Sequence, residues 1–152
     1  MTSAPVNLPY SETAIEIPFH DVDVLQITWH GHYIKYFEIA RCDLLRKIGY
    51  DYPQMKASGF IWPVTECYVK YIRPSSYGQR VIVSAQLIEY ENRMKINYLI
   101  RDSESGNKLT SGYTIQVALN SETKELQFVT PQVLWDQIEN HENLKDLKNV
   151  NA

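Results

Sequence analysis

The chain has 152 residues, 44% of them hydrophobic and 22% charged, with a formal net charge of −3. This length and composition fit one globular domain with its own core, which we expect to span residues 1–152. The acidic balance argues against a nucleic-acid-binding protein, and no window of 18 apolar residues predicts a membrane span.

The N-terminal residues lack the basic and apolar regions of a signal peptide. The chain contains two cysteines, Cys42 and Cys67, too few for a disulfide framework. We therefore expect a cytoplasmic protein in which both thiols are buried apolar groups rather than nucleophiles.

The first half of the chain predicts one strand and one long helix. Residues 1–12 contain two prolines among polar residues, so a loose arm is expected there. Isoleucines alternate with a glutamate within residues 14–19, which predicts a strand. A polar loop over residues 21–32 follows. Apolar residues then recur at helical spacing over residues 33–48 and end at a glycine, which predicts an amphipathic helix.

The second half predicts a series of strands joined by turns. A loop is expected at residues 50–59 and a short helix at 131–140, with a frayed tail from 141. Between them the apolar period changes to two, and strands are predicted over residues 61–72, 81–87, 94–100 and 109–119.

This order favours an α+β fold in which an antiparallel five-stranded sheet packs on one central helix. One helix covers only one face of such a sheet, so a homo-oligomer, a dimer or a tetramer, is the simplest cover for the rest.

Two aspartates and three histidines gather just before the predicted long helix: His20, Asp21, Asp23, His30 and His32. A carboxylate near a helix N-terminus supplies a base or nucleophile next to backbone N–H groups that can stabilise an oxyanion. Asp23 is our candidate for that carboxylate. The competing interpretation is that both aspartates cap the loop by accepting hydrogen bonds from nearby N–H groups.

The start of the helix also allows two interpretations. The backbone N–H groups of His30, Gly31, His32 and Tyr33 could form an oxyanion hole, strengthened by the helix dipole. The imidazole of His30 could orient a water molecule or hydrogen-bond to a thioester. Alternatively, His32 caps the helix and His30 is only a packed ring.

Other chemistries have weaker support. The chain has no His-Glu-x-x-His helix, no Cys-x-x-Cys pair and no Gly-x-Ser-x-Gly elbow, so we predict neither a metal site nor a serine hydrolase. Arg93 and Lys95 fall at a strand turn, and Lys70 and Arg73 fall near the end of another strand. They could hold the phosphates of a nucleotide-bearing thioester, or form a solvated rim.

Several short motifs occur together in this chain. In sequence order they are Asp21-Val-Asp23, Trp29-His30 with Tyr33, Tyr36-Phe37-Glu38-Ile-Ala-Arg41, Tyr71-Ile-Arg-Pro74 and Tyr77-Gly78. Over roughly residues 14–120, this combination resembles the hotdog-fold acyl-CoA thioesterases of the 4-hydroxybenzoyl-CoA thioesterase and Tol-Pal-associated types.

The resemblance implies a hotdog fold, a five-stranded sheet wrapped around a central helix, and assigns roles to residues. It implies that Asp23 is the catalytic carboxylate and that His30 contributes its N–H to the oxyanion hole and its side chain to the site. Leu25-Gln26 stands where many members have Ala-Gly or Gly-Gly, and His32 replaces the usual asparagine.

The function implied is hydrolysis of an acyl thioester carried by coenzyme A or by an acyl carrier protein, with no cofactor. Some members bind nucleotide phosphates through basic residues at a strand turn, which supports Arg93 and Lys95, with Arg73, as coenzyme A contacts. A 3-hydroxyacyl-thioester dehydratase and a non-catalytic acyl-thioester-binding protein remain the alternatives.

Overall fold

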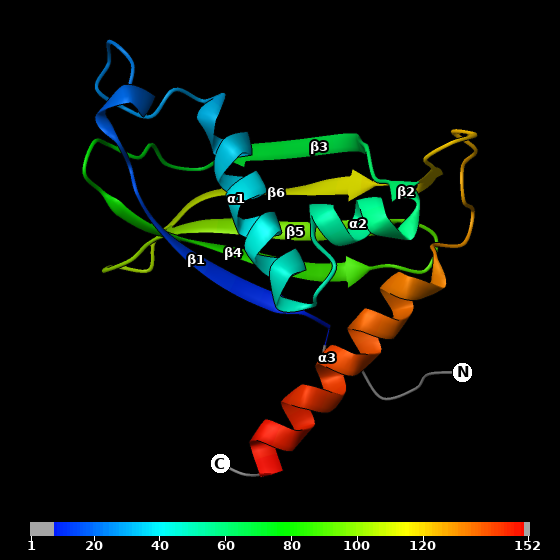
Figure 1. Cartoon of the computed structure of the whole chain (residues 1–152). Coiled ribbons are helices and arrows are strands. Elements are labelled where there is room, and N and C mark those ends of the chain that lie inside the picture. The colour runs from blue at the N-terminus through cyan, green and yellow to red at the C-terminus, as the bar shows by residue number, and fades with distance from the viewer. Residues whose placement is uncertain (1–7, 151–152) are drawn as a thin grey trace.

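The computed structural model describes the backbone of residues 8–150 and the side chains of residues 8–141. The elements in chain order are β1 (Tyr10–Glu16), the 3₁₀ turn η1 (Phe19–Asp21), α1 (His32–Lys47), α2 (Tyr52–Ser58), β2 (Phe60–Ile61), β3 (Val64–Tyr71), β4 (Arg80–Glu89), β5 (Met94–Asp102), β6 (Lys108–Gln116), β7 (Leu119–Asn120) and α3 (Gln132–Val150). The main sheet has five antiparallel strands in the order β1-β4-β5-β6-β3, and β2 pairs separately with β7. Helix α1 crosses one face of this sheet (Figure 1). The predicted α+β fold, with a five-stranded sheet on one long helix, is confirmed.

The buried face of α1 carries the core of the protein. Its buried residues are Tyr33, Tyr36, Phe37, Ala40, Leu44 and Leu45. The ring of Phe37 stacks on Tyr98 of β5, with the ring centroids 4.5 Å apart. A Cβ atom on Gly112 of β6 would lie 2.8 Å from the Phe37 ring, so only glycine lets the helix come this close. This contact fixes the height of α1 above the sheet.

Helix α1 lies over the β1 and β4 side of the sheet and leaves the opposite edge uncovered. At that edge, every residue of β3 except Val69 is exposed. The prediction that both cysteines are buried is therefore wrong for Cys67, because its strand is the edge strand. Cys42, on α1, is half-buried. Partial burial raises the pKa of the Cys42 thiol above its usual value, which disfavours the thiolate.

Helix α2 occupies most of the segment predicted to be a loop at residues 50–59. Asp51 and Gln54 form a capping box at its start, and Pro53 stands in its first turn. Gly59 ends the helix with φ +87°, in the left-handed region that favours glycine. These signals are present in the sequence, so the loop prediction is wrong because local capping outweighed the lack of a long apolar pattern.

The other differences lie at element boundaries. The strand predicted over 61–72 is split into β2 and β3, because Pro63 lies between them and has no N–H for the ladder. Strand β1 begins at Tyr10, earlier than predicted, and residues 1–7 of the expected arm lie outside the described part. Helix α3 continues to Val150, past the frayed tail expected from 141, since neither glycine nor proline interrupts it.

Candidate active site

The loop that precedes α1 folds into a tight hairpin. The Asp23 N–H donates to the Ile27 carbonyl, and the Gln26 N–H donates to the Asp23 carbonyl, each at 2.9 Å. Gln26 has a φ of +65°, a left-handed conformation that costs a non-glycine residue about 1 kcal/mol.

Asp23 is half-buried at the start of this hairpin. Its Oδ1 accepts a hydrogen bond from the Leu25 N–H at 2.8 Å, as the loop-capping interpretation predicts. Its Oδ2 has no hydrogen-bond partner within the described residues. The structure therefore leaves one carboxylate oxygen of Asp23 available for chemistry while the other holds the turn.

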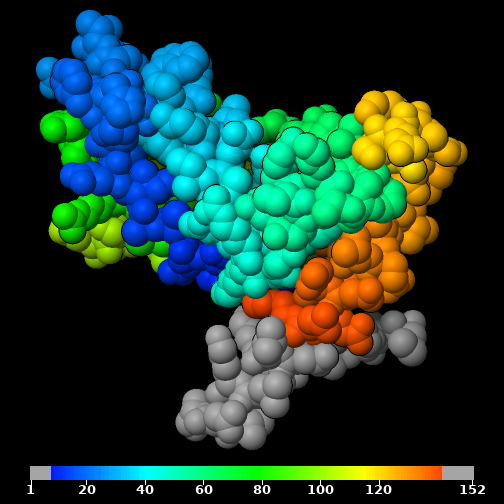
Figure 2. Space-filling model, viewed as in Figure 1, coloured from blue at the N-terminus to red at the C-terminus, as the bar shows by residue number. Residues whose placement is uncertain are grey.

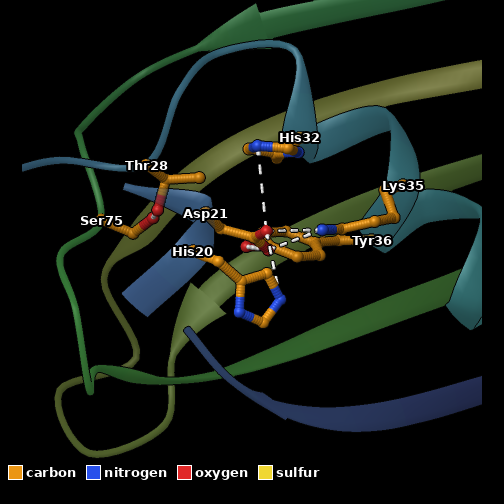
Figure 3. A network of polar contacts seen from close by, with 7 residues as sticks. All are labelled: His20, Asp21, Thr28, His32, Lys35, Tyr36 and Ser75. Carbon is orange, nitrogen blue, oxygen red and sulfur yellow. Dashed lines mark hydrogen bonds and ion pairs between the residues drawn. The ribbon is translucent and has the colours of Figure 1, made fainter. Parts of the chain in front are cut away.

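Asp21 is the most highly connected carboxylate of the cluster (Figure 3). It is 1% exposed, and both of its oxygens accept hydrogen bonds from Lys35 Nζ at 2.7 Å. The hydroxyl of Tyr36 donates to Oδ2 at 2.6 Å, and His32 Nε2 lies 3.8 Å from Oδ1. His20 is largely exposed, and its Nε2 lies 3.9 Å from Oδ1 of Asp21. Asp21 thus connects the loop to the first two turns of α1.

Burial by itself raises the pKa of the Asp21 carboxyl, but its partners reverse this effect. The hydrogen bonds from Lys35 and Tyr36, together with the positive charge of Lys35, hold the pKa below its usual value. Burial and the Asp21 carboxylate raise the pKa of the Tyr36 phenol. At neutral pH this network therefore contains an ionised Asp21 and a neutral Tyr36.

The start of α1 is positioned by the same loop. The Trp29 N–H donates to the backbone carbonyl of Asp21, and the His32 N–H donates to the Trp29 carbonyl, each at 2.9 Å. The His32 N–H is therefore occupied, which disagrees with its predicted place in the oxyanion hole. Among the described residues, the N–H groups of His30 and Gly31 have no partner and remain available.

A small hollow of about 290 Å³ opens beside the start of α1. Its lining includes three predicted site residues: His30, Tyr33 and Arg73. Tyr71 of β3 closes one wall, and its hydroxyl donates to the His30 carbonyl at 2.9 Å. Asp23 is not part of this lining, but its N–H donates to the carbonyl of Ile27, which is.

A chain of hydroxyl groups supports the hollow from within. The Ser75 Oγ lies 2.6 Å from Thr28 Oγ1 and 2.9 Å from the hydroxyl of Tyr33. Figure 3 shows Thr28 and Ser75 next to the Asp21 network. These contacts join the turn after β3 to the hairpin and to α1, so the hollow has a rigid base. Sequence reasoning did not single out Thr28 or Ser75, because nothing local marks hydroxyls that meet only in the fold.

Arg93 and Lys95 lie at the other end of the sheet from the hollow. Met94 and Val64 both pair with Gln116, whereas Tyr71, at the opposite end of β3, borders the hollow. Arg93 Nε is 3.1 Å from Glu89, and Lys95 Nζ lies 4.3 Å from the centre of the Tyr113 ring. Within one chain, these two predicted coenzyme A contacts therefore do not meet His30 or Arg73.

The histidines and aspartates do not come together as ligands. Across the described residues, no group of three or more His, Cys, Asp or Glu side chains is arranged to hold a metal ion. Nor is any helix of the described part long and apolar enough to cross a bilayer.

A five-stranded sheet packs on one central helix, and the hairpin that carries Asp23 precedes that helix. This is the fold of the hotdog thioesterase class. The family model of the Thioesterase-like superfamily matches residues 17–138, and the chain belongs to this superfamily. The predicted hotdog fold and the predicted thioesterase class are confirmed, and the chain is an enzyme that hydrolyses acyl thioesters.

Individual relatives agree with this assignment. The chain is 29% identical to a DHNA-CoA thioesterase structure from Staphylococcus aureus, with a TM-score of 0.77 over 94% of this chain and 95% of that one. It is 26% identical over 128 residues to sll0410 of Synechocystis, provisionally named an esterase, covering 84% of this chain and 77% of that protein. It is 28% identical over 80 residues to YneP of Bacillus subtilis, provisionally named an acyl-CoA thioesterase. That match covers 53% of this chain and 58% of YneP.

Proposed function

We propose that Asp23 is the catalytic carboxylate of this thioesterase, acting on acyl groups carried by coenzyme A or by an acyl carrier protein. The supporting observation is the contrast between the two aspartates. Asp21 is buried and each of its oxygens has close partners, whereas Asp23 keeps one oxygen without a partner. A group that attacks a carbonyl, or removes a proton from water, needs such an oxygen.

In this proposal the acyl carbonyl lies at the start of α1. Its oxygen accepts hydrogen bonds from the N–H groups of His30 and Gly31, where the helix dipole favours developing negative charge. Asp23 removes a proton from a water molecule, and the water oxygen forms a bond with the carbonyl carbon. The C–S bond then breaks, and the proton passes from Asp23 to the departing thiolate. A thiol has a pKa of about 8.5, so the thiolate leaves without a strong acid.

The imidazole of His30 forms part of the substrate site in the same proposal. Its ring lies edge-on to Tyr71, with the ring centroids 6.0 Å apart, and borders the hollow. This position suits a side chain that orients the thioester or the water, rather than one that carries the negative charge.

We further propose that the enzyme is a homodimer, or a tetramer built from such dimers. The exposed edge strand β3 offers unpaired backbone groups to a second copy. If two β3 strands paired antiparallel, the Val64 end of one would meet the Tyr71 end of the other. The Arg93–Lys95 turn of one protomer would then lie at the same end of the joined sheet as the hollow of its partner, where it could bind the phosphates of coenzyme A.

Such carriers occur in the cytoplasm, and we propose that compartment for the enzyme. The test is a thiol-release assay over a panel of acyl-CoA and acyl carrier protein thioesters, with wild type and Asp23→Asn. Asparagine keeps the shape of aspartate but cannot act as a base or nucleophile, so turnover should fall by about a thousandfold or more. A variant with more than about a tenth of the wild-type kcat would rule out Asp23 as the key residue.

A further inference from the structure

The segment that leads into α1 makes a tight turn just before the helix begins, at the surface of the molecule (Figure 2). The His32 N–H donates to the Trp29 carbonyl at 2.9 Å, which closes a β-turn whose two central residues are His30 and Gly31. Gly31 has φ −69° and ψ −20°, which fits the third residue of a type I turn. A type II turn needs a positive φ at that position, so the turn before α1 is of type I.

Glycine at the third position makes a second turn conformation accessible. Types I and II differ by a flip of the peptide between the two central residues, and glycine adopts the positive φ of type II without steric cost. Space requires the glycine, because a Cβ atom on Gly31 would overlap the ring of Trp29. The close contact that requires glycine therefore leaves the His30–Gly31 peptide able to flip, unless another group holds it.

Tyr71 of β3 is the group that holds this peptide. Its hydroxyl donates to the His30 carbonyl at 2.9 Å, across from the edge strand to the turn. In a planar trans peptide, the carbonyl of one residue and the N–H of the next point in opposite directions, and the described residues contain no cis peptide bond. The bond that fixes the His30 carbonyl therefore also fixes the direction of the Gly31 N–H. A flip would break this bond and reverse that N–H.

The hydroxyl of Tyr71 acts on the peptide separately from the packing of its ring. The ring lies 5.6 Å from the Tyr33 ring and 6.0 Å from the His30 imidazole, measured between centroids. These ring contacts need no hydroxyl. A hydrogen bond to a carbonyl also polarises the peptide, which makes the N–H at its other end a stronger donor.

We propose that Tyr71 is a positioning residue of the oxyanion hole: its hydroxyl keeps the turn before α1 in the type I form and so aims the Gly31 N–H at the oxygen of the reacting carbonyl. The inference rests on the proposed function, in which the N–H groups of His30 and Gly31 stabilise the oxyanion. It adds the group that holds this geometry in a turn that contains glycine. Tyr71 acts through the His30 peptide and takes no part in the making or breaking of bonds.

The experiment compares Tyr71→Phe, which removes only the hydroxyl, with Tyr68→Phe as the matched control. Tyr68 lies on the same strand and is 50% exposed against 49% for Tyr71, but it stacks on Tyr113 and does not line the hollow. We expect Tyr71→Phe to lower kcat about tenfold, with KM for acyl-CoA within about twofold, because the oxyanion forms only in the transition state. Tyr68→Phe should keep both constants, and light scattering should give wild type and both variants the same mass.

Nuclear magnetic resonance measures the turn itself and needs no turnover. The Hα of His30 is farther from the Gly31 N–H in a type I turn than in a type II turn, so the nuclear Overhauser effect between them is weaker in type I. This effect should be weak in wild type and in Tyr68→Phe, and should become stronger in Tyr71→Phe as the flipped peptide is populated.

The Asp23→Asn variant in the same assay separates this inference from the proposed role of Asp23. If Asp23→Asn keeps its turnover while Tyr71→Phe loses kcat and shows the flipped turn, the inference stands and only the role of Asp23 fails. If Asp23→Asn is inactive and Tyr71→Phe keeps a kcat within about twofold of wild type, the inference is wrong and Asp23 keeps its role. A raised KM at unchanged kcat, or a loss of kcat without any change in the Overhauser effect, would also overturn the inference.

Discussion

The two aspartates before α1 should respond in opposite ways to the same substitution. Asp21→Asn keeps the shape and one acceptor oxygen for the Tyr36 hydroxyl, but it removes the ion pair with Lys35. A hydrogen bond between charged groups contributes about 1.5–3 kcal/mol. Lys35 is 44% exposed and regains water when the pair is lost, so the value must be discounted for solvent screening. We expect Asp21→Asn to lower the free energy of unfolding by about 1–2 kcal/mol.

The difference in free energy of unfolding between wild type and Asp21→Asn should depend on pH in a defined direction. The pKa of the Asp21 carboxyl is lower in the folded protein than its usual value, so the ionised group stabilises the folded state. Its contribution is complete above the unfolded pKa of about 3.9 and is lost as the pH falls through the folded value. Wild type and Asp21→Asn should therefore differ fully at neutral pH and converge below about pH 4.

Urea unfolding across this pH range, combined with thiol release at pH 7, separates the two roles. Asp23→Asn is the matched control: its Oδ1 can still accept from the Leu25 N–H, so its stability should change by less than about 0.5 kcal/mol while its turnover collapses. Asp21→Asn should lose stability and retain more activity than Asp23→Asn. If Asp21→Asn instead abolished kcat at unchanged stability, the roles assigned to the two aspartates would have to be exchanged.

Three further predictions concern the assembly, the carrier and metal ions. Light scattering at micromolar concentration should give a mass at least twice 17.7 kDa, and a monomer mass would contradict pairing through β3. Changing both Arg93 and Lys95 to Ala should raise KM for acyl-CoA with little change in kcat, because phosphate contacts far from the carbonyl stabilise ground and transition states alike. That effect should shrink at high salt, and a defect confined to acyl carrier protein substrates would instead assign the two residues to a protein partner. Prolonged EDTA dialysis should leave turnover intact, and loss of activity together with a stoichiometric metal would show that the His and Asp cluster binds metal.

Much of the fold could be predicted from local patterns. The change from helical to alternating period separates α1 from the strands that follow, because side-chain direction along each element depends only on its own geometry. Helix α2 was equally readable, through Asp51, Gln54 and Gly59, although we predicted a loop. The motif around Asp21 and Asp23 was sufficient to indicate a thioesterase.

The sequence by itself thus determined the elements, the class of fold and the segment that carries the chemistry. It could not show the physical difference between the two aspartates, since the partners of Asp21 on α1 are 14 and 15 positions away and meet it only after the helix docks on the sheet. Strand order and register, too, are properties of the whole sheet. The order places Cys67 on an exposed edge strand, and the register places Lys95 at the end of the sheet away from the hollow. Burial and pairing between distant segments depend on packing, and packing is decided only when all the elements are in place.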